Sequence, residues 1–241
     1  MLQLSTSARL SSRPGLVHGF TTRRGGVSTG GLASLNLARR PGEREEALVE
    51  NWRRVVGEAD LALAHQVHGD RVLVVGEGAG PLDVVGEADA LVTTTPGLIV
   101  AVRVADCVPV LLVAPGGVAA VHAGWRGTVA GIVERAVAVL CEVTGTRPEQ
   151  VTAAIGPAIG VCCYEVGSEV ASRVAERAPE AVDASRAREH VDLRRANAVH
   201  LRRSGVGAID EVGGCTRCDP DSFSHRRDPT CGRLAGFVGR T

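Results

Sequence analysis

The stretch from Leu98 to Thr128, LIVAVRVADCVPVLLVAPGGVAAVHAGWRGT, decides the fold. It holds three short apolar runs rich in β-branched residues, LIVAVRV, VPVLLV and GVAAV, separated by Asp106-Cys107 and by Pro115-Gly116. Runs of this length, bounded by turn residues, are typical of buried neighbouring strands. We therefore expect these residues to form the core of a β-sheet.

Helical patterns surround this core. Thr128 can cap a helix that Gly145 ends, with apolar residues at a 3.6-residue period at Val129, Ile132, Val133, Ala136, Val137 and Leu140. Weaker helical patterns cover residues 43–56, 168–178 and 192–204, residues 76–89 form a loop, and the strings RVLVV, VTAAI and LAGFV indicate strands. The sequence predicts an α+β (mixed α/β) fold, a single domain over residues 1–241 with mixed β-sheets flanked by helices.

The composition indicates which residue types fill the core and whether the protein binds nucleic acid. Hydrophobic residues make up 44% of the 241 residues and aromatic residues only 2%, so Val, Ala, Leu and Ile must fill the core. The 27 basic and 27 acidic side chains cancel, so no overall field draws the protein to a nucleic-acid backbone. We expect no nucleic-acid partner.

The start of the chain and its thiols indicate a compartment. The first residues, MLQLSTSARLSSRPG, are polar and Ser-rich, and they contain no secretory or membrane segment. The seven cysteines are an odd number, and without an export signal a disulfide framework is not expected. We expect a cytoplasmic protein without membrane contact, whose thiols serve metal binding or catalysis.

Three short segments combine reactive side chains: His65-Gln66-Val67-His68, Asp106-Cys107 and His122 with the residues after it. All are expected at strand ends. In an extended strand His65 and His68 point to opposite faces, so only one of them can join Cys107 and His122. A His, Cys, His set matches a catalytic zinc site, which has three protein ligands and one open position. The alternative is that Cys107 is a nucleophile paired with His122.

Longer strings identify a resemblance. In order, HQVHGDRV, EADALVT, ADCVPVLL, AAVHAGWRGT, AAIGPAIGVCCYEVG and DLRRAN closely resemble the bacterial laccase-domain or polyphenol-oxidase family, also described as zinc-dependent purine nucleoside phosphorylases. The strings HGFTTRRGGVSTGGLASLNL and SHRRDPTCGR fit as well. Two departures are Ala158, where many relatives carry Cys, and His225, where the tail often reads SYRRD. The resemblance implies a laccase-domain-like fold.

The resemblance also implies an activity and a site. It implies one zinc ion per chain, held by His68, Cys107 and His122, which would also be the catalytic residues, with copper as an adventitious substitute. It implies phosphorolysis of adenosine, inosine and methylthioadenosine, with adenosine deamination as a further activity. The residues that match the family near the pocket, and so are expected to bind the nucleoside or phosphate, are Arg23, Asn36, Gln66, Arg126 and Tyr164. We expect a monomer.

Three other functions stay open at this point. A copper-dependent polyphenol oxidase is disfavoured, because the chain has seven histidines, no His-x-His pair and no Met besides Met1 to serve as an axial ligand. A factor that edits peptidoglycan precursors is a role also attached to relatives. A non-enzymatic interaction module stabilised by zinc would need a fourth protein ligand beside the three.

The remaining cysteines are given a structural interpretation. Cys162 and Cys163 are expected to be small buried hydrophobic residues, because adjacent cysteines are badly placed to pair. Cys215 and Cys218, with His225 and Cys231 behind them, have a local spacing compatible with a second zinc, but we expect free thiols there. The tail should be ordered, since residues 234–238 form an apolar strand.

Overall fold

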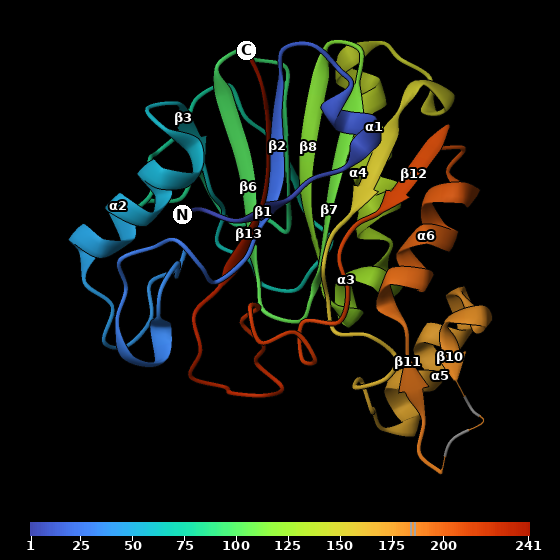
Figure 1. Ribbon diagram of the computed structural model, residues 1–241. Coiled ribbons are helices and arrows are strands. Elements are labelled where there is room, and N and C mark those ends of the chain that lie inside the picture. Colours follow the sequence, from blue (N-terminus) through green and yellow to red (C-terminus); the bar gives the residue numbers. More distant parts are fainter. Residues whose placement is uncertain (184, 186) are drawn as a thin grey trace.

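Two mixed β-sheets pack face to face in the computed structural model, which describes residues 1–183, 185 and 187–241 (Figure 1). The first sheet has the order β1 (Leu4–Ser5), β2 (Leu16–Thr21), β13 (Leu234–Arg240), β6 (Leu98–Val104) and β3 (Asp60–Ala62). The second has the order β12 (Ala208–Glu211), β9 (Thr152–Ile155), β7 (Val108–Ala114), β8 (Gly117–Ala123), β5 (Ala90–Thr93) and β4 (Val72–Val74). A short pair, β10 (Val182–Asp183) and β11 (His190–Val191), lies outside both.

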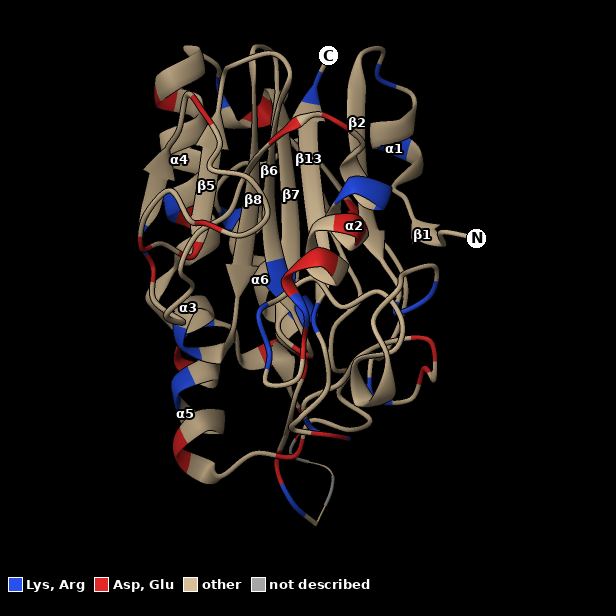
Figure 2. Cartoon of the chain, turned by 90° about the vertical axis from the view of Figure 1, so that its left-hand side faces the viewer, with Lys and Arg blue, Asp and Glu red and all other residues tan. Residues whose placement is uncertain are grey.

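Helices cover the outer faces of the two sheets. The helices are α1 (Ala8–Ser11), α2 (Glu45–Val56), α3 (Trp125–Ala130), α4 (Ile132–Thr144), α5 (Ser168–Arg177) and α6 (Leu193–Arg203). Figure 2 shows α2 lying over the first sheet, with its acidic and basic residues marked. Helices α4 and α6 pack on the second sheet, so the order of layers is helix, sheet, sheet, helix. The predicted mixed fold with β-sheets flanked by helices is confirmed.

Alternation along β7 explains why the central strands are apolar throughout. Val108, Val110 and Leu112 face α4, whereas Leu111 and Val113 face the first sheet. A strand between two layers has no solvent face, so it reads as a continuous hydrophobic run. Small and branched aliphatic residues make up most of the buried core, as the composition predicts.

The β7–β8 hairpin brings two distant positions together. Its turn consists of Pro115 and Gly116, and Gly116 has φ 90°, a left-handed conformation that glycine adopts without strain. In the resulting register, Val108 pairs with Ala123. Cys107, directly before β7, therefore lies beside the end of β8, where His122 is located.

The predicted helix after this hairpin differs from the observed one. Thr128 does not cap it: the helical conformation already begins at Trp125, and Thr128 lies inside α3. Gly131, with φ 85°, separates α3 from α4, which ends before Gly145 as expected. The weaker helical patterns correspond to α2, α5 and α6, and the three predicted strands to β4, β9 and β13.

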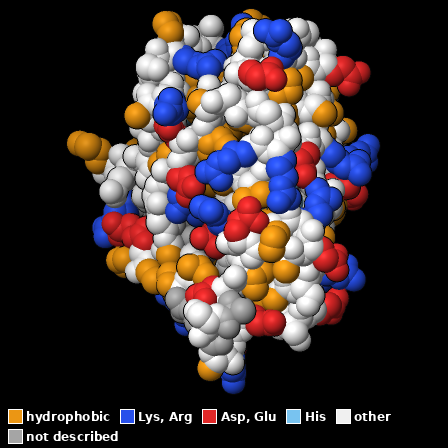
Figure 3. Space-filling view, turned by 90° about the vertical axis from the view of Figure 1, so that its right-hand side faces the viewer, with side chains coloured by type: hydrophobic (Ala, Val, Ile, Leu, Met, Phe, Trp, Pro, Cys, Tyr) orange, Lys and Arg blue, Asp and Glu red, His pale blue; other side chains and the backbone are white. Residues whose placement is uncertain are grey.

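The surface carries charges of both signs. Figure 3 shows Arg side chains interspersed with Asp and Glu on the face that is on the right in Figure 1. None of the helices in the described part of the chain is both long and apolar enough to cross a membrane.

Candidate metal centre and its cavity

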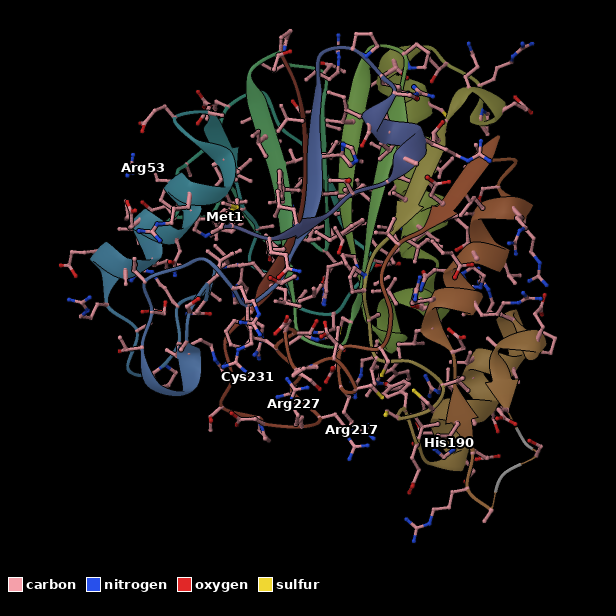
Figure 4. The ribbon with its side chains drawn as sticks, viewed as in Figure 1. Met1, Arg53, His190, Arg217, Arg227 and Cys231 are labelled. Atoms are coloured by element: carbon pink, nitrogen blue, oxygen red, sulfur yellow. The ribbon has the colours of Figure 1, made fainter. Side chains whose placement is uncertain are left out.

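A cavity of about 700 Å³ lies where the loops at one end of the two sheets meet. The loops that carry Cys231, Arg227 and Arg217 run along this end, which is the lower edge of the sheets in Figure 4. The three residues expected to bind metal, His68, Cys107 and His122, all line the cavity. Segments that are distant in sequence thus converge on one site.

The three candidate ligands are close enough to share one ion. One donor atom from each of His68, Cys107 and His122 lies within 4.8 Å of the others. The rings of His68 and His122 meet edge to face, with their centroids 4.7 Å apart. Zinc bonds of about 2.0 to 2.3 Å can join such a set after small side-chain movements. Among the described residues, no fourth His, Cys, Asp or Glu joins this group.

His68 does not lie on a strand. Its φ is 62°, a left-handed conformation that is uncommon for a residue with a side chain. The backbone N–H groups of Val67, His68 and Gly69 donate hydrogen bonds to the carboxylate of Asp89, at 3.3, 3.0 and 2.7 Å. Because this segment is a tight turn, the predicted alternation does not apply, and His65 lines the cavity together with His68.

Asp89 also orients His122. Its Oδ1 atom lies 2.7 Å from His122 Nδ1, and neither side chain is more than 3% exposed. An Nδ1–H that donates to this carboxylate leaves His122 Nε2 free to bind a metal. Burial would raise the pKa of Asp89, but the hydrogen bonds from His122 and Gly69 outweigh burial and hold the pKa below its usual value. Asp89 was not among the residues predicted from the sequence, although its position directly before a buried strand was an available signal.

Cys107 is prepared to act as a thiolate. Burial alone would raise its pKa, but the charge of His122 and hydrogen bonds from His122 and His68 lower it to about 6. Burial opposes charge on His122 as well, yet Cys107 and Asp89 raise its pKa to about 9. Since the thiolate is the form of Cys that binds metal, the donor set fits a soft divalent ion such as zinc.

Gly124 leaves the space that this centre needs. A Cβ atom added at this position would lie 2.9 Å from His68 Cδ2 and 3.2 Å from Cys107 Sγ. The first distance is shorter than a normal carbon contact, so any side chain here would displace His68. The glycine in the string HAGWRG is therefore part of the site.

Asp106 fastens the tail of the chain to the Cys107 loop. Its φ is 89°, and its carboxylate accepts hydrogen bonds from Thr216 Oγ1 at 2.7 Å and from the backbone N–H of Arg226 at 2.7 Å. These bonds bring Arg226 to the cavity wall, and its guanidinium lies 5.2 Å from the centre of the Tyr164 ring. The tail is thus ordered around the site.

Two of the five predicted substrate residues line the cavity. Gln66 is held by the backbone of Arg103, to which its Nε2 donates and from which its Oε1 accepts, both at 2.9 Å. Tyr164 is partly buried, and burial together with the negative charge of Cys107 raises its pKa to about 12. Its hydroxyl therefore keeps its proton at neutral pH.

The other three do not line it. Arg23 lies in a separate small pocket with Arg24, donates to Ala33 O and stacks over Phe223 at 4.7 Å. Asn36 is fully buried, and its Nδ2 donates to Ala38 O and Glu43 Oε2 inside the protein. Arg126 is exposed and lies over the ring of its neighbour Trp125 at 4.4 Å.

A cluster of three arginines lines the cavity, and Arg23 is not one of them. Arg40, Arg103 and Arg233 line the cavity, and none of them forms an ion pair with the carboxylates of the described residues. Burial lowers the pKa of Arg103 and of Arg233, and repulsion from the neighbouring guanidiniums lowers each further. The buried Nε of Arg40 has no hydrogen-bond partner in the described part of the chain. The three guanidinium groups are partly buried and donate to uncharged backbone carbonyls, so their positive charges favour a bound anion. The members of this cluster come from three distant segments, so no local pattern in the sequence predicts it.

The fold and site together define a four-layer α/β protein with a candidate His2Cys metal centre in an arginine-rich cavity. The chain belongs to the family described as multi-copper polyphenol oxidoreductase laccase, whose sequence model matches residues 17–241. The resemblance inferred from the motifs is thereby confirmed.

Relatives and solved structures agree with this assignment. A purine nucleoside phosphorylase of Deinococcus radiodurans is 41% identical over 92% of this chain and 88% of its own length. A second one, from Streptomyces griseus, is 40% identical over 91% of this chain and 92% of its own. The crystal structure of YlmD from Geobacillus stearothermophilus matches 94% of this chain and 92% of its own with a TM-score of 0.88 at 36% identity. These are proteins that the chain resembles over nearly its full length.

Proposed function

We propose that this protein is a zinc-dependent purine nucleoside phosphorylase that acts on adenosine and inosine, and on methylthioadenosine. The observation that carries the proposal is that the His2Cys set and an arginine cluster share one cavity. A phosphorylase needs a phosphate site near the sugar and groups that stabilise the charge on the departing base, and a bound zinc ion is one such group. The relatives named purine nucleoside phosphorylase support the same conclusion.

Zinc fits the donor set of His68, Cys107 and His122, and when bound it supplies positive charge that stabilises the charge moving onto the departing purine. The chain's own residues prepare the ligands. Asp89 fixes the tautomer of His122 and the turn that carries His68, and Gly124 keeps the space between His68 and Cys107 free. These contacts reduce the reorganisation that binding requires.

Phosphate is proposed to bind at Arg40, Arg103 and Arg233. In the reaction a phosphate oxygen bonds to C1′ of the ribose while the bond from C1′ to the base nitrogen breaks. The base leaves with the electron pair of that bond and with a proton that phosphate brings, and the products are free base and ribose 1-phosphate. Guanidinium groups suit this role because they bind phosphate through paired N–H donors.

Tyr164 and Gln66 are proposed to have different roles. The Tyr164 hydroxyl keeps its proton and can donate a hydrogen bond to the nucleoside. Gln66 is a positioning residue, since its amide holds the backbone of Arg103 next to the loop of His65 and His68. Gln66 thus connects the phosphate site to the metal site.

A panel of nucleosides with and without phosphate tests the proposal. We expect adenosine and inosine to release free base together with ribose 1-phosphate, and only when phosphate is present. Base release without phosphate, or the absence of turnover for every purine nucleoside with a zinc-loaded enzyme, would contradict it. Inosine formed from adenosine would add the deaminase activity.

The rival functions give different results in the same preparation. Oxidation of phenols with consumption of oxygen, by protein that holds copper rather than zinc, would favour the oxidase. A closed site that exchanges no water, seen by spectroscopy of cobalt-substituted protein, would favour an interaction module. The monomeric state and cytoplasmic location stay predictions.

A further inference from the structure

Four cysteines from two loops lie close together, and none of them lines the cavity. Cys162 and Cys163 lie in the loop after β9, and Cys215 and Cys218 lie in the loop after β12. Because β9 and β12 are parallel neighbours in the second sheet, their following loops leave the sheet at the same edge. A bridge between Ala158 and Cys215 extends this pairing to the cysteines. Arg217, labelled in Figure 4, lies on the second of these loops.

The four sulfur atoms have the spacing of a metal site. All four lie within 4.8 Å of one another, with 3.4 Å between Cys163 Sγ and Cys218 Sγ and 3.8 Å between Cys162 Sγ and Cys218 Sγ. Four zinc–sulfur bonds of about 2.3 Å in a tetrahedron place the sulfur atoms about 3.8 Å apart. A disulfide, with sulfur atoms about 2.05 Å apart, would use only two of the four. The measured distances thus resemble a metal-thiolate set.

Donor groups surround these sulfur atoms. The backbone N–H of Gly160 donates to Cys215 Sγ at 3.2 Å, and the N–H groups of Arg217 and Cys218 also bond this sulfur. The Arg217 side chain hydrogen-bonds Cys163. Thiolates bound to a metal carry negative charge and accept such hydrogen bonds, which hold the ligands in place.

We propose that Cys162, Cys163, Cys215 and Cys218 bind a second zinc ion in a closed four-thiolate site. Four protein ligands leave no open position, so this ion is structural. The expectation that Cys162 and Cys163 are buried hydrophobic residues is wrong, because Cys162 is exposed and Cys163 is only partly buried. The expectation of free thiols in the tail concerned Cys215 and Cys218 together with Cys231 and His225. Instead, Cys231 is buried against an apolar cluster with Phe223, and His225 lines the cavity.

The second ion stabilises one wall of the cavity. Tyr164 follows Cys163 directly, and Thr216, which donates to Asp106 beside Cys107, follows Cys215 directly. A metal that ties the two loops together therefore fixes Tyr164 and the Asp106 contact at the same time. This inference is independent of the reaction proposed above.

Metal analysis of the full chain tests the site. Protein purified with zinc and without chelator should contain two zinc ions per chain. The C215S/C218S variant should fall to one, C107A should also fall to one, and the control C231S should keep two. Zinc content that is the same in C215S/C218S as in the unaltered protein, or that falls to zero in C107A, would overturn the assignment.

Cadmium gives a second readout that does not depend on activity. Titration of metal-free protein with Cd²⁺ should give thiolate-to-metal absorption, of which C107A loses about a fifth, because it removes one of five thiolate ligands, and C215S/C218S loses most. Equal losses in the two variants would contradict a four-thiolate site.

Alkylation of the unaltered chain covers the case in which the variants do not fold. Iodoacetamide should modify the four cysteines slowly in zinc-loaded protein and rapidly after a chelator is added, with Cys141 as the internal control. Equal rates before and after the chelator, or a disulfide between Cys163 and Cys218 in freshly purified protein, would overturn the proposal.

Discussion

His122 Nδ1 lies 2.7 Å from Oδ1 of Asp89, a fully buried carboxylate that also accepts the backbone N–H groups of residues 67–69. One side chain therefore orients two candidate metal ligands, His122 through its ring and His68 through its backbone. His68 and His122 are distant in sequence. Because both are hydrogen-bonded to Asp89, this one carboxylate fixes their positions relative to each other.

Replacing Asp89 with Asn should weaken zinc binding at the His2Cys centre. Asn has the same shape as Asp, but one of the two carboxylate oxygens is replaced by an NH2 group. This donor would face the N–H donors of His122 and of the backbone of residues 67–69, where an acceptor is needed. We expect a loss of affinity of roughly 10- to 100-fold, measured by competition with a chromophoric chelator. Asp70→Asn is the matched control, since Asp70 pairs with Arg135 at the surface. Equal zinc affinity in D89N and D70N would contradict this role of Asp89.

Gly124→Ala should disturb the same centre by volume alone. The added Cβ meets His68 Cδ2 and Cys107 Sγ, so we expect the variant to fold but to hold substoichiometric zinc at this centre. Metal content of the purified variant gives the measurement. Gly31→Ala is the control, because a Cβ at Gly31 meets no atom within 4 Å. Full zinc content in G124A would show that His68 can move aside without loss.

Arg40→Met should raise the KM for phosphate. It removes one cation of the cluster while keeping approximate bulk, and a charged hydrogen bond contributes about 1.5 to 3 kcal/mol. Phosphate KM should therefore rise between about tenfold and about a hundredfold, with a smaller change in the KM for inosine. Initial rates at varied phosphate provide the test.

Two further variants serve as comparisons for Arg40→Met. Arg195→Met, at an exposed position on α6, is the control for removal of one positive charge. Arg23→Met should also leave phosphate KM unchanged, because Arg23 lies outside the cavity. A raised phosphate KM in R23M together with an unchanged one in R40M would place the anion site at the Arg23 loop instead.

Glu134→Gln should destabilise the fold in a pH-dependent way. Glu134 on α4 bonds Arg177 of α5 at 2.6 Å and lies 3.3 Å from His200 Nδ1 of α6. Burial would raise its pKa, but His200 and Arg177 outweigh burial and hold it below the usual value. A carboxylate with a lowered pKa stabilises the fold above its unfolded pKa, and this contribution is lost as pH falls through the folded pKa.

The measurement is urea unfolding of both proteins at several pH values. We expect E134Q to be less stable than the unaltered protein by about 1 to 3 kcal/mol at pH 7, with the difference shrinking below pH of about 4. Glu142→Gln, an exposed position on the same helix, is the control. A difference that does not change with pH would assign the effect to packing rather than to charge.

Local patterns in the sequence were sufficient for the elements and for part of the site. The apolar runs from Leu98 to Val121 predicted β6, β7 and β8, because strands between two layers need apolar side chains on both faces. The Pro115-Gly116 turn then makes the proximity of Cys107 and His122 a consequence of hairpin register. The choice of His68 came from the family resemblance.

Only the tertiary structure showed which contacts hold the site residues together. The HQVH segment was expected to be extended, but Asp89 holds it in a turn, and that contact depends on β5 lying beside β4 and β8. The arginine cluster and the four cysteines are each assembled from loops that are distant in sequence. The physical reason is that a buried helix or strand needs apolar residues at a regular short spacing, and this spacing can be recognised in the sequence. The order of the strands in a sheet determines which loops meet at one edge. That order depends on packing between layers, which local sequence patterns do not predict.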